Sequence, residues 1–251
     1  MIAELSDDQL DRYARHIILK EIGGGGQAKL LAANVAVVGA GGLGSPCLMY
    51  LAAAGVGRLT VIDDDTVALS NLQRQVLHGT ADVGRAKTDS ARDGLARINP
   101  DTIVTACPVR LDPGNAASLL AAHDVVADGS DSFGTRLTVA DVCLTLRIPL
   151  VSAAVGPFDG QLATFRGWEA DTPCYRCFVG DAPGREDVSC ADHGVLGALT
   201  GVLGAMQALE VIREITGFGP TLAGRLLLFD ALGMRMRTLA LAKDPACPAC
   251  R

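Results

Sequence analysis

Hydrophobic and polar positions along this chain predict strands and helices that alternate. Short β-rich runs typical of strands occupy residues 34–38, 59–62, 102–109, 124–127 and 150–153. Stretches with helical periodicity lie between them, at residues 44–54, 87–98, 115–121 and 133–146. This alternation favours a Rossmann-like, doubly wound α/β fold with a mainly parallel sheet and helices on both faces.

The pattern changes after residue 156. Strand-like pieces at residues 161–165, 225–229 and 235–241 surround a predicted helix over residues 195–215. We expect these pieces to extend the same sheet with antiparallel pairing, so that residues 1–251 form a single domain. The glycines of the helix permit close packing, and a contact inside one subunit is favoured over a contact across a dimer.

The N-terminal segment carries a helix start signal. Ser6 with Gln9 three residues later is a capping-box pattern, and the apolar residues that follow lie on one helical face. Four consecutive glycines, residues 23–26, predict the end of this helix and a mobile joint. Residues 1–26 are therefore expected to form a helical arm.

Composition and charge narrow the class of protein. The 251 residues include 22 Lys and Arg against 28 Asp and Glu, a formal net charge of −6. That balance argues against nucleic acid or an anionic membrane as a general partner. The polar start shows no secretory signal, and the apolar run at residues 194–209 is too short and too interrupted to span a bilayer. We expect a cytoplasmic protein.

A glycine-rich turn follows the strand predicted at residues 34–38. Glycines here permit a tight turn, close approach of a phosphate and tight packing of helix on strand; they are Gly39, Gly41, Gly42 and Gly44. The following helix adds unpaired N–H groups for an anion. Asp63 ends the next strand, 19 residues after Gly44, where a carboxylate accepts hydrogen bonds from ribose hydroxyls. This pattern alone fits a nicotinamide dinucleotide as well as other nucleotides.

Polar residues further along favour a triphosphate. Its larger negative charge requires cations, which Arg74 and Lys87 supply, while Asn71 offers an amide. Asp131 follows a predicted parallel strand, at the edge where open α/β sheets bind ligands. Its carboxylate suits Mg²⁺, which takes one or two protein carboxylates besides phosphate oxygens. Taken singly, each residue also fits a surface charge or a helix cap.

The cysteines predict a metal site. Two Cys-x-x-Cys pairs lie beside turn-forming prolines and match a closed tetrahedral zinc site: Cys174, Cys177, Cys247 and Cys250. Such a site would join distant segments and attach residues 243–251 to the body of the domain. A redox pair or two disulfides are alternatives that the sequence context favours less. Cys190 lies in a polar loop and is a candidate nucleophile, although a lone loop cysteine is more often incidental.

These motifs together resemble a known family. In chain order they are Arg12-Tyr13-x-Arg15, the glycine turn, Asp63-x-Asp65, Ser70-Asn71-Leu72-Gln73-Arg74-Gln75, Lys87, Asp131 and the paired cysteines. They resemble the ubiquitin-activating-enzyme-like adenylyltransferases (HesA/MoeB/ThiF) that activate sulfur-carrier proteins for molybdopterin and thiamine synthesis. The resemblance covers almost the whole chain.

The resemblance implies an activity and a role for each matching residue. The enzyme would use ATP to activate the C-terminal glycine carboxylate of a ubiquitin-like carrier that ends in Gly-Gly, forming an acyl-adenylate. Asp63 would bind the ribose, Asp65 would also lie at the nucleotide, and Asn71, Arg74 and Lys87 would hold the phosphates. Asp131 would ligate Mg²⁺, and Arg15 would reach the ATP phosphates of the other subunit in a homodimer. The four paired cysteines would bind zinc.

The chain also departs from the family pattern. Ser132 stands where the family usually has Asn, next to the proposed magnesium ligand. The sequence includes no rhodanese-like sulfurtransferase domain, which implies a separate protein as sulfur donor. Cys190 matches a cysteine that bonds covalently to the carrier in the thiamine branch and is dispensable in the molybdopterin branch, so the branch stays open.

Two other functions remain as alternatives. An NAD-dependent oxidoreductase would explain the glycine turn and Asp63, but it leaves Asn71, Arg74 and Lys87 without a role. A zinc-stabilised nucleotide-binding protein without catalytic activity would explain the same motifs. ATP binding separates the first alternative from an adenylyltransferase, and adenylation of a carrier separates the second.

Overall fold

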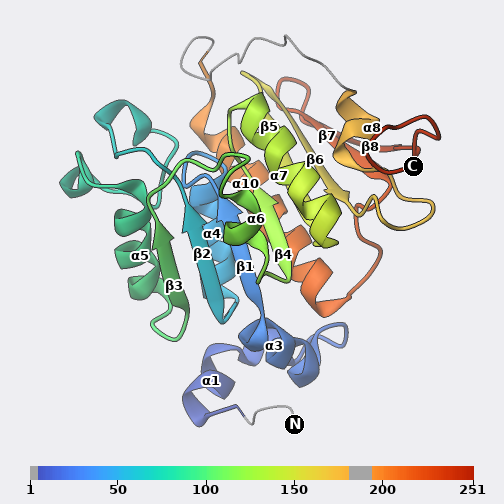
Figure 1. Cartoon of the computed structure of the whole chain (residues 1–251). Coiled ribbons are helices and arrows are strands. Elements are labelled where there is room, and N and C mark those ends of the chain that lie inside the picture. The colour runs from blue at the N-terminus through green and yellow to red at the C-terminus, as the bar shows by residue number, and fades with distance from the viewer. Residues whose placement is uncertain (1–4, 181–193) are drawn as a thin grey trace.

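The computed structural model describes residues 5–180 and 194–251 and confirms the predicted fold class. In this part of the chain, eight strands form one sheet in the order β3-β2-β1-β4-β5-β6-β7-β8 (Figure 1). The strands are β1 (Asn34–Val38), β2 (Arg58–Ile62), β3 (Ile103–Cys107), β4 (Val125–Asp128), β5 (Leu150–Val155), β6 (Asp159–Phe165), β7 (Arg225–Asp230) and β8 (Arg235–Ala240).

The sheet has a parallel part and an antiparallel part. β1 pairs in parallel with β2 on one side and β4 on the other, and β2–β3 and β4–β5 are parallel too. The pairs β5–β6, β6–β7 and β7–β8 are antiparallel, as expected for the C-terminal extension. The strand order reverses between β1 and β4, and such a reversal opens a crevice at the carboxyl ends of these strands.

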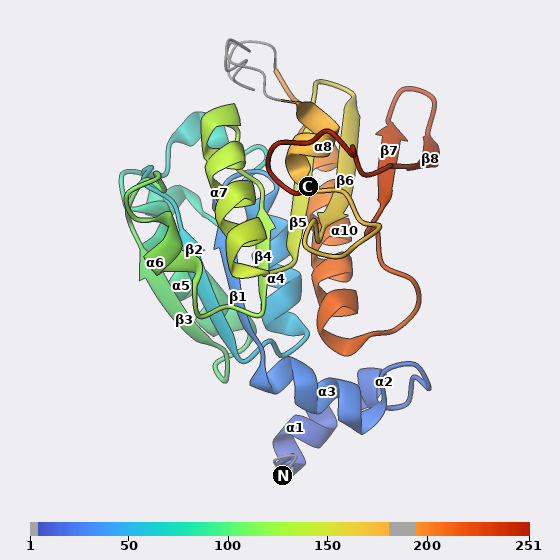
Figure 2. The same cartoon turned by 45° about the vertical axis from the view of Figure 1, so that its right-hand side comes forward.

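Helices cover both faces of the sheet (Figure 2). They are α1 (Asp7–Arg12), α2 (Ala14–Ile17), α3 (Gly23–Ala32), α4 (Gly44–Ala53), α5 (Lys87–Ile98), α6 (Ala116–Leu120), α7 (Phe133–Leu146), α8 (Tyr175–Val179) and α10 (Gly197–Thr216). One apolar cluster joins the sheet to α3, α4, α5 and α10, and a second joins it to α6, α7 and α8. The core is therefore divided between two layers, one on each side of the sheet.

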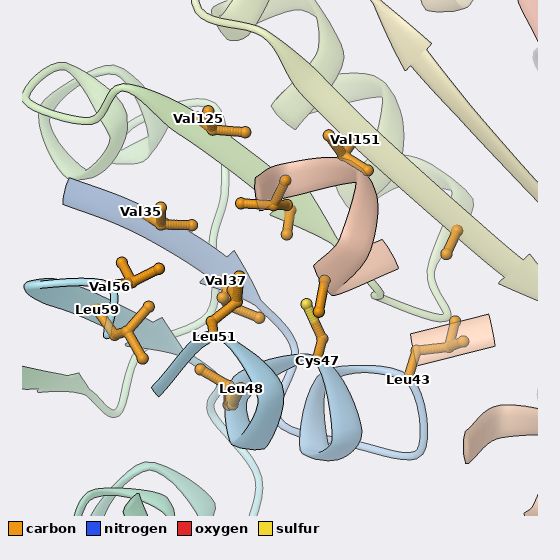
Figure 3. Packing of buried hydrophobic residues seen from close by; sticks show 14 of the residues in the cluster. Val35, Val37, Leu43, Cys47, Leu48, Leu51, Val56, Leu59, Val125 and Val151 are labelled. Carbon is orange, nitrogen blue, oxygen red and sulfur yellow. The ribbon is translucent and has the colours of Figure 1, made fainter. Parts of the chain in front are cut away.

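The strand sequences explain how both layers form. In β1, Val35 and Val37 belong to the first cluster, whereas Ala36 and Val38 belong to the second. Successive side chains of a strand point to opposite faces, so a continuous apolar run buries both sides. Figure 3 shows the first cluster, where side chains of α4, such as Leu51, lie against those of the strands.

The glycines of α10 provide contact inside the chain, as the sequence suggested. A Cβ on Gly204 would lie 2.3 Å from the carbonyl oxygen of Leu43 and 2.4 Å from Cγ of Pro46. Because a side chain has no room there, Gly204 brings α10 against the start of α4. No helix among the described residues is both long enough and apolar enough to cross a membrane.

The predicted joint at residues 23–26 is wrong. The capping box of Ser6 and Gln9 forms as expected, but the four glycines begin α3 instead of ending a helix. Gln27 of α3 is fully buried, and its Nε2 donates a hydrogen bond of 2.9 Å to the carbonyl oxygen of Ala54. Packing against the end of α4 thus outweighs the low helix propensity of glycine.

The break in the N-terminal arm lies earlier, at Tyr13, which caps α1 and precedes α2. Its side chain is 2% exposed, and its hydroxyl accepts a hydrogen bond of 2.8 Å from Nδ2 of Asn99. Gly55, with φ of 85°, leaves room for the ring, since a Cβ there would approach it to 2.6 Å. These contacts fix the N-terminal arm to the side of the domain where the parallel strands begin.

Candidate functional site

A cleft of about 410 Å³ lies at the carboxyl ends of the parallel strands. Its walls come from the turn after β1, the end of β2, the loops after β3 and β4, and the start of α10. The structure brings together these residues predicted for the nucleotide site: Gly39, Gly41, Gly42, Asp63, Asp65, Arg74, Lys87 and Asp131. Residues from distant parts of the sequence therefore meet in one crevice.

Within the described part of the chain, three predicted residues are not part of these walls. Gly44 begins α4 behind the turn, and Asn71 ends a short 3-10 helix (Leu69–Asn71) outside the cleft. Arg15 is exposed on α2, in the arm at the amino ends of the strands, which Figure 2 shows below the sheet. Cys190 lies outside the described residues.

The glycines of the turn have different steric roles. Gly39 has φ of 90°, and its N–H donates a hydrogen bond of 2.8 Å to the carbonyl oxygen of Ile62. A Cβ on Gly44 would stand 1.8 Å from the carbonyl oxygen of Gly39, which no side chain tolerates. At Gly41 the nearest atom to an added Cβ is Nε2 of Gln75, at 3.6 Å. The fold requires glycine at 39 and 44, whereas position 41 is open toward the cleft.

Asp63 is fixed by backbone N–H groups on both carboxylate oxygens. Oδ2 accepts from Ala40 at 2.7 Å, and Oδ1 accepts from Asp65 at 2.9 Å. Burial raises the pKa of the Asp63 carboxyl above its ordinary value, and the Lys87 charge and the two N–H groups oppose that rise. Each carboxylate oxygen has a second lone pair, so the group can still accept a hydrogen bond from a sugar hydroxyl.

Lys87 is a buried cation at the first position of α5. Its side chain is 6% exposed, and its Nζ lies 2.7 Å from Oδ2 of Asp65. The backbone N–H of Lys87 also donates to the carbonyl oxygen of Asp65, at 3.0 Å. The charge is thus held in place before any ligand arrives. Arg74, which donates to the carbonyl oxygen of Ser70 at 3.2 Å, is held less firmly.

The loop after β4 depends on an ion pair that the sequence analysis missed. Asp128 is fully buried, and its carboxylate accepts from the N–H and hydroxyl of Ser130 at 3.1 and 2.7 Å. Arg136, in the first turns of α7, lies 3.7 Å from that carboxylate and donates to the carbonyl oxygen of Ser130. Ser132 caps α7 through the N–H of Thr135. Together these contacts fix the segment that carries Asp131.

Further polar residues line the cleft without having been predicted, among them Gln75, Arg110 and Arg136. Gln75 belongs to the Ser70–Gln75 motif, so its place in that run was a usable signal. Its Oε1 is buried and has no partner within the described part of the chain. For Arg110, the only signal was that it follows a strand whose carboxyl end meets the crevice. Arg136 carried no signal beyond its place near the start of a helix.

The paired cysteines converge as predicted. The Sγ atoms of Cys174, Cys177, Cys247 and Cys250 all lie within 4.8 Å of one another. Contacts of 3.7, 3.6 and 3.4 Å join three of the sulfur pairs. A tetrahedral zinc with Zn–S bonds of about 2.3 Å requires sulfurs about 3.8 Å apart. The donor set and its spacing therefore fit a structural zinc ion, which these four thiolates would enclose completely.

Polar contacts attach this cysteine cluster to the domain. Arg176, between the first two cysteines, makes two hydrogen bonds of 2.7 Å to the carboxylate of Asp141 on α7. Lys243, at the start of the C-terminal tail, donates to the carbonyl oxygens of Gly167 and Glu169, each at 2.9 Å. The cluster thus holds the tail against α7 and the segment after β6.

The sequence is similar to that of known proteins of one family, and the fold is similar to that of a solved structure. The model of the ThiF family matches residues 13–249. The chain is 47% identical to the SAMP-activating enzyme E1 of Haloferax volcanii, over 100% of this chain and 92% of that protein. It is 42% identical to the molybdopterin-synthase adenylyltransferase of Escherichia coli, over 99% of each. The crystal structure of E. coli MccB with MccA-N7isoASN has the same fold, with a TM-score of 0.84 at 23% identity, covering 96% of this chain and 75% of that one.

The steric difference between Gly41 and Gly44 gives a prediction. Gly41→Ala should fold normally but weaken ATP binding roughly tenfold, because the methyl group would occupy the side from which phosphate approaches. Gly44→Ala should destabilise the fold by about 3 kcal/mol through backbone overlap. Calorimetric titration and thermal unfolding measure the two effects. Gly201→Ala, with nothing within 4 Å of the added Cβ, is the control: it should leave ATP binding unchanged and should not lower the unfolding temperature, because alanine favours the helix more than glycine does.

The cysteine cluster gives a second prediction. Purified protein should contain one zinc per chain, and the double variant Cys247→Ser, Cys250→Ser should lose it and unfold at a lower temperature, since two of the four ligands are removed. Metal analysis and thermal unfolding are the measurements. Cys107→Ser is the matched control, because Cys107 is a free cysteine outside the cluster. Zinc retained in full by the double variant would contradict the assignment.

Proposed function

This chain belongs to the ThiF family, and we propose that it adenylates the C-terminal glycine of a small ubiquitin-like sulfur-carrier protein with ATP. The relatives' names support this class of reaction, since one is a molybdopterin-synthase adenylyltransferase and another a SAMP-activating enzyme. The observation that carries the proposal is the cleft itself, where the glycine turn, the cations Arg74 and Lys87, and Asp131 meet.

In the proposed reaction, an oxygen of the carrier's terminal carboxylate attacks the α-phosphorus of ATP. A new C(O)O–P bond forms, the bond from the α-phosphorus to the bridging oxygen breaks, and that oxygen leaves with pyrophosphate. A carboxylate is already a competent nucleophile, so no general base is required. Catalysis then depends on positioning and on stabilisation of the charge that moves onto pyrophosphate.

The charged residues of the cleft support catalysis by positioning and charge stabilisation. Lys87 is buried and paired with Asp65, so it needs little reorganisation when negative charge develops beside it. Arg74 adds a planar guanidinium group, which can donate two parallel hydrogen bonds to phosphate oxygens. Asp63, fixed by two N–H groups, is assigned to the ribose. Asn71 stays assigned to the phosphates, although in this structure it lies outside the cleft walls.

Magnesium is the proposed companion of ATP, with Asp131 as its protein ligand. Asp131 is exposed at the rim of the cleft, on the loop that Asp128 and Arg136 hold. One carboxylate suffices, because Mg²⁺ commonly keeps several waters and binds phosphate oxygens. Ser132 caps α7 through its side chain, so the position next to Asp131 already has a structural use.

A molybdopterin-type carrier is the first candidate, because a relative named for that pathway matches 99% of the chain. The protein is proposed to act as a homodimer in which Arg15 reaches the cleft of the partner subunit. Its exposed place on α2, away from the cleft of its own chain, and the exposed Ile18 and Leu19 beside it support that arrangement.

The first test is ATP–pyrophosphate exchange with Mg²⁺, with molybdopterin-type and thiamine-type carriers supplied in parallel. We expect exchange that depends on the molybdopterin-type carrier. Arg74→Ala should slow it by about 10²–10³, the scale of losing one preorganised donor. Arg58→Ala is the control, because it removes an exposed arginine at the amino end of β2, whereas the cleft lies at the carboxyl ends of the strands. It should leave the exchange rate unchanged. ATP binding without exchange on either carrier would contradict the proposed function and support the non-catalytic alternative.

The second test asks whether Arg15 acts across the dimer. Arg15→Ala and Lys87→Ala subunits with different tags are co-expressed, and the mixed dimer is purified. It should recover about half of the wild-type exchange rate, because one of its two sites then has both residues. A mixed dimer of Arg74→Ala and Lys87→Ala subunits is the control, since both residues line the same cleft and neither site is intact. Recovery in neither mixture, from confirmed dimers, would overturn the role of Arg15.

A further inference from the structure

A buried histidine lies directly behind the glycine turn. His78 is 6% exposed and is not part of the cleft walls. Its Nε2 is 2.9 Å from the carbonyl oxygen of Ala40, and its Nδ1 is 2.8 Å from Oγ of Ser90 on α5. Because a carbonyl oxygen only accepts, Nε2 must carry the proton and donate to Ala40. In the neutral ring, Nδ1 then accepts from the Ser90 hydroxyl.

Ala40 is held from several directions. Its N–H donates to Asp63, and its carbonyl oxygen accepts from both His78 and Oγ of Ser45, the latter at 3.2 Å. The Ala40–Gly41 peptide is planar and trans, so its C=O and the N–H of Gly41 point in opposite directions. With the carbonyl bound by His78, the N–H of Gly41 must point away from the histidine.

Gly41 itself lines the cleft. Within the described residues, no hydrogen bond takes up its N–H. A backbone N–H without a partner at the start of a helix is a donor that suits phosphate oxygens. The orientation of one peptide therefore decides whether the cleft presents this donor to an anion.

We infer that His78 is a positioning residue for the nucleotide: its Nε2–H holds the Ala40–Gly41 peptide so that the N–H of Gly41 faces the ATP phosphates. This role rests on the proposed function. His78 touches neither the cleft nor the reacting atoms, and it acts only through Ala40.

The surroundings of His78 keep it a neutral donor. Burial lowers the pKa of the ring below its ordinary value, and the charge of Lys87 adds to that effect. The carbonyl of Ala40 and the carboxylates of Asp63 and Asp82 act in the opposite sense without reversing it. Near neutral pH the ring thus has one N–H, and the carbonyl contact fixes it on Nε2.

Two isosteres separate the two contacts of the ring. In His78→Gln the side-chain amide nitrogen reaches the place of Nε2 and can donate to Ala40. In His78→Asn the shorter amide reaches only the place of Nδ1 and keeps the Ser90 contact. We expect ATP affinity in the glutamine variant within about threefold of wild type, and roughly tenfold weaker in the asparagine variant, the scale of one lost hydrogen bond.

The measurements are calorimetric titration with Mg²⁺ and ATP, KM for ATP and for the carrier in the exchange assay, and thermal unfolding. Only the KM for ATP should rise in His78→Asn. His78→Met has the length of glutamine but no donor. If the asparagine variant does not fold, the methionine variant takes its place, and its ATP affinity should be roughly tenfold weaker than that of wild type. His123→Asn is the matched control, because His123 is a half-buried histidine bonded to Thr60 and Leu120 outside the cleft. It should lower only the unfolding temperature.

The outcomes separate this role from the proposed function. If wild-type protein binds ATP, and the folded asparagine, methionine and glutamine variants bind it equally well or equally poorly, the positioning role is overturned while the adenylyltransferase stands. Wild-type protein that binds no ATP would overturn both. A donor-dependent loss of ATP affinity, with unfolding temperatures alike among the variants, supports the role.

Discussion

The close contact between two turns at the centre of the sheet is the constraint on which the site depends. β1 and β4 are parallel neighbours, and their carboxyl ends lead into the glycine turn and the loop that carries Asp131. A Cβ on Gly39 would stand 3.2 Å from the carbonyl oxygen of Gly129, and one on Gly129 would stand 3.0 Å from Cβ of Leu43. Because both turns lack side chains at these points, the two backbones meet where the strand order reverses, which is where open α/β sheets bind ligands.

The charged groups of the cleft are held by contacts with other residues of the chain. Lys87 is paired with Asp65, Arg136 with Asp128, and both oxygens of Asp63 accept backbone N–H groups. Each of these contacts costs conformational freedom during folding, not during binding. The charges of the cleft are therefore preorganised, and preorganised charges stabilise the negative charge that develops on phosphate groups in the transition state. The formal charge of −6 of the whole chain conceals this local arrangement.

The cysteine cluster and the cleft share a helix. α7 begins with the Ser132 cap, beside Asp131, and Arg136 follows in its first turns. Further along the same helix, Asp141 holds Arg176, which lies between the first two cysteines. A zinc ion at the cluster would therefore restrain α7 as well as the C-terminal tail. That connection gives a distant metal site a physical reason to matter for the nucleotide.

The sequence by itself determined the order of the elements, the glycine turn and the four paired cysteines that fit a metal site, because periodicity, backbone sterics and ligand spacing are local properties. Tertiary structure alone decided that residues 23–26 begin a helix, since only packing of Gln27 against the end of α4 offsets glycine's poor propensity. It also decided that Arg136 reaches the cleft and that Arg15 does not. His78 and Ala40 are 38 residues apart, and their hydrogen bond exists only because the segment before α5 packs against the glycine turn. Contacts between distant residues follow from the way whole elements pack, and no local pattern records that.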